Sequence, residues 1–166
     1  MAGSFGAESR RWEKREHRGQ PAYGTVSTRT FDTTVEDLWD AITKPERIAR
    51  WFGTVQGQLE RGGRFQIVGN AEGTIERCDA PEALDLTWEF GGTMSWVRAR
   101  VGSEGGRARL TIEHFSHPVE EGPGAEFFAT YGPAAGAWAG ISDSRAFACT
   151  WPASTRRWSR RRPRRG

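Results

Sequence analysis

Apolar and polar side chains alternate with a period of two through most of the middle of the chain. Successive side chains of a strand point to opposite faces of a sheet, so this period predicts strands that bury one face. A first strand is predicted from Tyr23 to Phe31. Six more follow, separated by turn residues such as paired glycines, and they cover Thr54–Glu60, Arg64–Gly69, Gly73–Cys78, Leu84–Phe90, Ser95–Gly102 and Arg109–Phe115.

The pattern changes to a helical period in the segment that follows the first strand. Apolar residues there recur three and four positions apart, which predicts a helix with one apolar face. The helix is expected over Val35–Thr43, and its apolar face holds Val35, Leu38, Trp39 and Ile42. We expect Trp39 to be a core residue that packs on the sheet.

Two signals set the ends of this helix. Thr33 and Glu36 have the spacing of a capping box at its start. Pro45 ends it and opens a second short helix over Glu46–Trp51. One strand, two helices and a strand meander, in this order, indicate an α+β fold with an antiparallel sheet of about six to seven strands.

The charge of the chain is unevenly distributed. The 166 residues carry a net charge of +3, but residues 145–166 contain eight arginines and no acid, and residues 1–20 carry +2. Residues 21–144 therefore carry −7. The predicted globular body is acidic, which argues against a specific nucleic-acid partner for it. We interpret the tryptophan-containing arginine tail as a segment that attracts polyanions without specificity.

Other sequence features limit the expected cellular location and the expected chemistry of the protein. No apolar run approaches the roughly 18–20 residues that span a bilayer, and the N-terminus lacks the apolar region of a signal peptide, so a cytoplasmic location is expected. Cys78 and Cys149 are too far apart to indicate a disulfide framework, and the three histidines have no metal-ligand spacing. Phosphate loops, dinucleotide fingerprints and serine nucleophile elbows are absent, so no cofactor is predicted.

A series of ordered motifs resembles a known superfamily. It consists of FDTTVEDLWDAITKPERIARWFG over residues 31–53, then GGRF, GTIE, CDAP, LDLTWEF and LTIEH. The series is similar to the SRPBCC (START-like, helix-grip) superfamily, in the bacterial branch related to activators of the heat-shock chaperone ATPase. The resemblance covers residues 23–133. It implies a long antiparallel sheet curved around a C-terminal helix, with an apolar cavity between them for a hydrophobic ligand.

The chain departs from this family after residue 133. A long amphipathic helix is expected there, but residues 134–166 are rich in Ser, Pro and Arg and show no sustained apolar stripe. We interpret this tail as aberrant and disordered, and a one-base slip of the reading frame is our hypothesis for its origin. The predicted organisation is a mobile arm over residues 1–20, the helix-grip domain over 21–133, and the tail.

Five residues are candidates for lining the cavity. Large aromatic side chains on the sheet and at the end of the second helix fit a site for a hydrophobic molecule, although each also fits plain core packing. The one histidine at a strand position, in phase with two apolar neighbours, would point at the ligand or be a hydrogen-bonded structural residue. The candidates are Trp51, Phe65, Trp88, Trp96 and His114.

Three classes of function follow from the resemblance. The first is non-enzymatic binding of a hydrophobic small molecule in the cavity. The second is a polyketide cyclase- or dehydratase-like reaction in the same cavity, with His114 as the general acid and base. The third is a chaperone-associated interaction module, whose acidic outer surface contacts a protein partner.

Overall fold

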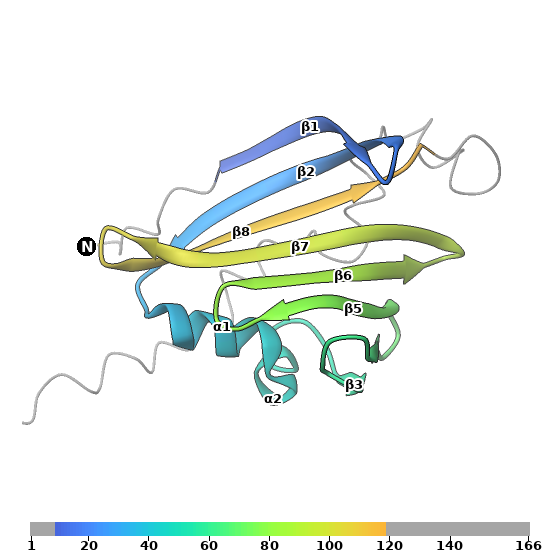
Figure 1. Ribbon diagram of the computed structural model, residues 1–166. Coiled ribbons are helices and arrows are strands. Elements are labelled where there is room, and N and C mark those ends of the chain that lie inside the picture. The colour runs from blue at the N-terminus through green and yellow to red at the C-terminus, as the bar shows by residue number, and fades with distance from the viewer. Residues whose placement is uncertain (1–8, 119–166) are drawn as a thin grey trace, which may run out of the picture.

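The computed structural model describes residues 9–118, which form one curved antiparallel sheet of eight strands and two short helices (Figure 1). The α+β class predicted from the sequence is confirmed. Neighbouring strands follow the order β1-β2-β8-β7-β6-β5-β4-β3. The elements are β1 (Ser9–His17), β2 (Gln20–Phe31), α1 (Val35–Thr43), α2 (Pro45–Ile48), β3 (Val55–Gly57), β4 (Arg64–Ile67), β5 (Glu72–Asp79), β6 (Ala83–Phe90), β7 (Thr93–Glu104) and β8 (Arg107–Ser116).

All seven predicted strands are present, as β2 to β8. The first strand of the sheet differs from the prediction, because residues 9–17 of the predicted mobile arm form β1 and pair with β2 along their whole length. The expected C-terminal helix, the tail and the hypothesis of a frame slip concern segments outside the described residues.

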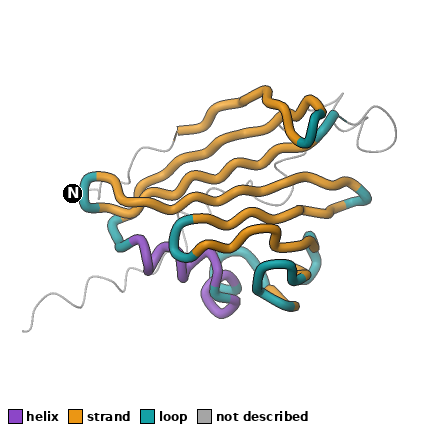
Figure 2. The backbone as a smooth tube through the Cα atoms, viewed as in Figure 1, coloured by secondary structure: helices purple, strands orange, loops and turns teal. Residues whose placement is uncertain are grey.

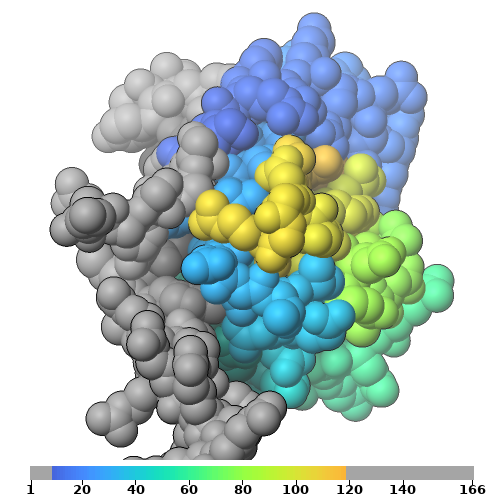
Figure 3. Space-filling view, turned by 90° about the vertical axis from the view of Figure 1, so that its left-hand side faces the viewer, coloured from blue at the N-terminus to red at the C-terminus, as the bar shows by residue number. Residues whose placement is uncertain are grey.

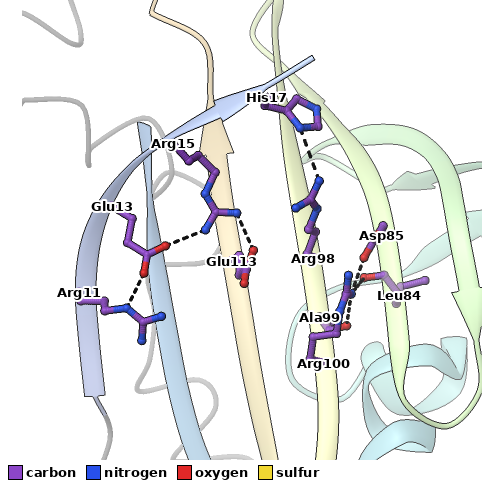
Figure 4. A network of polar contacts seen from close by, with 10 residues as sticks. All are labelled: Arg11, Glu13, Arg15, His17, Leu84, Asp85, Arg98, Ala99, Arg100 and Glu113. Carbon is purple, nitrogen blue, oxygen red and sulfur yellow. Dashed lines mark hydrogen bonds and ion pairs between the residues drawn. The ribbon is translucent and has the colours of Figure 1, made fainter. Parts of the chain in front are cut away.

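Side-chain ion pairs reinforce the backbone pairing of β1 with β2. Glu13 accepts hydrogen bonds from Arg11 at 2.6 Å and from Arg15 at 2.8 Å, and Arg15 reaches Glu113 on β8 at 2.7 Å (Figure 4). Burial opposes the charge of Arg15, but its hydrogen bonds to these two carboxylates outweigh that cost and raise the pKa of the guanidinium. A strand held in this way has no apolar alternation, so hydrophobic periodicity does not detect it.

Helix α1 has the predicted bounds, but its cap lies one residue later than predicted. Thr34 is the N-cap, and its side-chain oxygen accepts a hydrogen bond from the backbone N–H of Asp37 at 3.2 Å. Thr33 instead donates to the Asp37 carboxylate at 2.7 Å. Helix α2 ends at Ile48, before the predicted Trp51.

The first core cluster lies between α1 and the ends of β7 and β8. Leu38 and Trp39 of α1 are 1% and 7% exposed, so Trp39 is the core residue that its helical position predicts. A backbone hydrogen bond of 3.1 Å from Ala108 to Thr33 fixes the start of the helix beside β8. In the end-on view the β7–β8 turn, in yellow, lies against the α1 segment, in blue (Figure 3). The cluster comprises Phe31, Leu38, Trp39, Ala99, Val101, Ala108 and Leu110.

Both helices lie on one side of the sheet (Figure 2). We call the sheet surface that carries them, with Leu110 and Ala99, the inner face, and the opposite surface, with Trp96 and Phe115, the outer face. The two helices are joined by polar contacts. Arg47 of α2 donates to the Asp37 carboxylate at 2.6 Å and to the Asp37 carbonyl at 3.0 Å.

The Arg47–Asp37 pair predicts an acid-sensitive helix joint. Burial opposes ionisation of Asp37, but hydrogen bonds from Arg47 and Thr33 outweigh it and lower the pKa of the carboxyl. Because the pKa of Asp37 is lower in the folded state than in the unfolded state, where it is near 3.9, the ionised carboxylate stabilises the fold at pH values above 3.9. This stability is lost as the pH falls through the folded-state pKa.

We therefore expect Asp37→Asn to lower the free energy of unfolding at pH 7 by about 1 kcal/mol, a value discounted for the partial exposure of the carboxylate. The variant should also lose part of the pH dependence below pH 4, which urea titrations at several pH values measure. Asp40→Asn is the matched control, because its exposed partner Lys44 lies on the same helix. An equal loss of unfolding free energy in both variants would contradict a stabilising role for the Arg47–Asp37 pair.

Candidate functional site

A cavity of about 150 Å³ lies between the two helices and the inner face of the sheet. Its walls come from α1, α2, the segment after α2, and strands β3 to β8. Apolar side chains dominate the lining, and the described part of the lining contains no acid, lysine, arginine or histidine. The lining residues include Ile42, Ile48, Trp51, Phe52, Val55, Phe65, Ile67, Ile75, Leu84, Leu86, Trp88, Val97 and Ile112.

Four aromatic rings form a continuous wall of this cavity. The ring centroids of Trp51 and Phe52 are 5.5 Å apart, those of Phe52 and Trp88 are 6.0 Å apart, and those of Phe65 and Trp88 are 6.5 Å apart. Phe65 and Trp88 are 6% and 8% exposed. Three of the five residues predicted from the sequence are therefore brought together around one cavity.

Most polar side-chain atoms in the lining are hydrogen-bonded to other groups of the protein. Thr43 donates its hydroxyl proton to the Trp39 carbonyl at 2.7 Å, and the Trp51 indole donates to the Ala41 carbonyl at 3.0 Å. Both contacts complete the end of α1, where carbonyls lack helical partners. The Cys78 thiol is a further lining group, and it is a weak hydrogen-bonding group.

His114 lies on the inner face, as predicted from its phase with Leu110 and Ile112, but it is not part of the described lining. Its ring packs against the edge of the Trp88 ring, with the centroids 6.2 Å apart, and the residue is 5% exposed. Its Nε2 lies 2.8 Å from the Ser95 hydroxyl, which donates to the Trp88 carbonyl at 3.2 Å. The Ser95 hydroxyl thus links the His114 ring to the backbone of β6.

Trp96 lies outside the cavity, which differs from the prediction. The Gly91-Gly92 turn pairs Trp88 with Ser95, and pairs Thr87 with Trp96. Paired residues share a face, so Ser95 lies on the inner face with Trp88. Adjacent positions of a strand point to opposite faces, so Trp96 lies on the outer face. There its ring stacks on Phe115, with the centroids 6.0 Å apart.

The sequence interpretation missed much of the aliphatic lining. Ile42 had been assigned to the apolar face of the first helix, and the structure places it at the cavity. Ile67 shares the strand phase of Phe65, and Ile75 lies between two polar residues, so their inward phase was visible in the sequence. The inward phase of Val97 was not, because it requires the adjacent Trp96 to point outward. The meeting point of these residues was not visible either, because it depends on the pairing of β4 to β7.

Two searches of the described residues gave no result. Residues 9–118 contain no group of three or more His, Cys, Asp or Glu side chains placed to hold a metal ion. No helix in the same range has the length and apolar character needed to cross a bilayer.

Comparison with known proteins identifies the family. The profile of the family described as "Activator of Hsp90 ATPase homolog 1-like protein" matches residues 32–144. The chain belongs to this family. The SRPBCC resemblance predicted from the sequence is thereby confirmed, and the fold of the family is compatible with a ligand-binding or an Hsp90-activator-like role. A search of the curated proteins gives no match.

Solved structures support the assignment. The crystal structure of CalU16 from Micromonospora echinospora is 35% identical, with a TM-score of 0.63, and the match covers 67% of this chain and 71% of that one. The crystal structure of PFC0360w, an HSP90 activator from Plasmodium falciparum, is 20% identical, with a TM-score of 0.50, and the match covers 63% and 82% of the two chains. MLL2253 from Mesorhizobium loti is 22% identical with a TM-score of 0.55, covering 68% and 86%. The last two matches show a shared fold.

The hydrogen bond between Ser95 and His114 gives a stability prediction. Ser95→Ala removes the hydroxyl that is hydrogen-bonded to Nε2 of the buried His114, and we expect the free energy of unfolding to fall by about 1–3 kcal/mol. Ser103→Ala, an exposed position on the same strand, is the control and should change it by less than about 0.5 kcal/mol. Chemical denaturation measures both variants, and a neutral Ser95→Ala would show that this contact does not stabilise the fold.

Proposed function

We propose that the protein binds a small hydrophobic molecule in the inner-face cavity and does not transform it. The observation that carries the proposal is the lining, which is rich in aromatic and aliphatic side chains and has no acidic or basic group among its described members. Ligand sites are mostly apolar concavities with few polar groups, whereas general acid–base catalysis needs a titratable group within reach of the substrate.

The size of the cavity supports a compact ligand. An enclosed apolar cavity of about 150 Å³ takes up molecules the size of benzene, and this partly open cavity has a similar volume. The four-ring wall offers stacked and edge-on contacts to a planar guest. Trp51, Phe65 and Trp88 are the predicted ligand contacts that this geometry supports.

The enzymatic alternative depends on His114. The ring lies beside Trp88, its Nε2 is hydrogen-bonded to Ser95, and His114 is not among the described lining residues of the cavity. A His114→Ala variant that still binds ligand but loses turnover of a polyketide-like substrate would favour this alternative over simple binding.

A chaperone-related function is the second candidate, and family membership is the observation that favours it. Its test is the steady-state ATPase rate of a purified Hsp90 with and without the full chain. Stimulation that charge reversal at exposed acids of the domain removes would favour this candidate, and an unchanged rate would count against it.

Filling the cavity tests the binding proposal. We expect 4-fluorotoluene to bind the full chain saturably, observed as a shift and broadening of its ¹⁹F resonance. Ala99→Leu places a larger apolar side chain in the cavity and should abolish binding without lowering the melting temperature, because filling a cavity restores lost contacts.

The matched control is Trp96→Phe, on the same strand but on the outer face. This variant should bind the probe as the unmodified chain does. Binding that survives Ala99→Leu, or that Trp96→Phe removes, would place the probe outside the cavity and contradict the proposal.

A further inference from the structure

A second cluster of functional groups lies on the outer face, where the end of the β1–β2 hairpin folds over the sheet. The His17 ring lies 4.5 Å from the Trp96 ring and 4.9 Å from the Phe115 ring, measured between centroids. The guanidinium of Arg18, in the hairpin turn, lies over Trp96 at 5.4 Å, and that of Arg98 lies over Phe115 at 4.9 Å. The guanidinium of Arg15 also lies over Phe115, at 4.8 Å, and the His117 ring lies 4.8 Å from the Trp96 ring. The hairpin turn and strands β1, β7 and β8 thus gather cations and rings in one cluster.

This cluster contains two buried N–H donors that have no partner. Trp96 is 5% exposed, and its indole Nε1 is fully buried without a hydrogen-bond acceptor. Nε2 of His17 is likewise buried and unpartnered. Arg98 donates to Nδ1 of His17 at 3.5 Å (Figure 4), so the neutral imidazole carries its proton on Nε2. Buried donors are nearly always paired, so two orphans in one cluster indicate a missing acceptor.

The charges of the cluster favour an acceptor that is negative. Arg98 has no ion pair with a carboxylate anywhere in residues 9–118, unlike Arg15 and Arg18, which pair with Glu113 and Glu76. The carboxylates of its cross-strand neighbours Asp85 and Glu113 pair with Arg100 and Arg15 instead. A guanidinium beside N–H donors is the arrangement that binds oxyanions through charge-assisted hydrogen bonds.

The hairpin turn provides a route to these donors. Among the described residues, the ion pair of this turn joins Arg18 to Glu76 at 2.5 Å, with side chains 54% and 33% exposed. Exposed pairs contribute little to stability. The turn residues Arg18 and Gly19 both have positive φ, at 53° and 75°, as in a tight two-residue hairpin. The route to the donors is therefore past the exposed Arg18 side chain, which lies over Trp96.

We propose that the outer-face cluster of Trp96, His17 and Arg98 is a binding site for a small oxyanion, such as a phosphate or a carboxylate group. The Trp96 and His17 N–H groups donate to the anion, and the guanidinium of Arg98 neutralises it. The site is on the opposite face of the sheet from the hydrophobic cavity, and it does not depend on the function proposed for that cavity.

The proposal has a consequence for pH. Burial and the positive charges of Arg98, Arg18 and His117 lower the pKa of His17, and Glu76 opposes them only in part. A bound anion stabilises the imidazolium and raises this pKa, so binding takes up a proton. The affinity for the anion should therefore increase as the pH falls through the pKa of the anion-bound form.

The experiment uses the ¹⁵N-labelled full chain, with the Trp96 indole resonance assigned through Trp96→Phe. Sodium phosphate and sodium acetate are titrated separately at constant ionic strength, with sodium chloride as the reference, at pH 7 and pH 6. We expect a saturable downfield shift of the Trp96 indole proton with at least one of the two anions, and tighter binding at pH 6. Comparison of the two anions distinguishes a phosphate group from a carboxylate group.

Two variants of β7 separate the site from general electrostatics. Arg98→Gln should weaken binding at least about tenfold, as expected for loss of a hydrogen bond to a charged group. Arg100→Gln, on the same strand and face but paired with Asp85, should change it by less than about threefold. Equal loss in both variants, or a shift that chloride reproduces, would overturn the proposal.

The remaining variants test the two donors. With acetate, which stays ionised at both pH values, His17→Gln should remove the pH dependence, and its persistence would exclude His17. Trp96→Phe keeps the ring that packs on Phe115 but removes the donor, and it should weaken binding observed at the His17 ring protons. An indole resonance that no anion moves would also overturn the proposal, because it would mean that the donors are orphaned or hold only water.

Discussion

The antiparallel pairing of β6, β7 and β8 is the constraint on which both faces of the molecule depend. It pairs Trp88 with Ser95, and Val97 with His114, so these side chains share the inner face. The alternate positions of these strands, including Trp96, point to the outer face. A shift of β7 by one residue would turn Val97 and Ala99 outward and bring Trp96, Arg98 and Arg100 to the cavity face. The tight Gly91-Gly92 turn, in which both residues have positive φ, fixes this register.

The two helices convert the inner face into a cavity. Helix α1 covers only the part of the sheet around Leu110 and Val101, where the first core cluster forms. Beyond its end the chain turns at Pro45, and the contacts of Arg47 with Asp37 and of Trp51 with Ala41 hold α2 at the rim. Polar contacts therefore hold the walls of the inner-face cavity in place. The surface of these walls is apolar. A hydrophobic guest there gains contacts without displacing a charged group.

The sequence predicts this fold well where the signals are local. Strands β2 to β8 and helix α1 follow from alternation, helical periodicity and turn residues, and Phe65, Trp88 and Trp51 were assigned to the region that the structure shows as a cavity wall. Strand β1 was missed because Arg15 and Glu113, which are 98 positions apart, stabilise it through charge. Trp96 was placed on the wrong face because strand phase alone does not determine register. The orphaned donors on the outer face result from contacts among three strands, which no local pattern reports.

The position of a bound molecule tests the central claim most directly. Intermolecular nuclear Overhauser effects can be measured between a small aromatic guest and the methyl groups of the full chain. The account predicts contacts from the guest to Ile75, Val97 and Ile112, which line the cavity from three strands. Contacts to the outer face, or to no methyl group of these three residues, would contradict it.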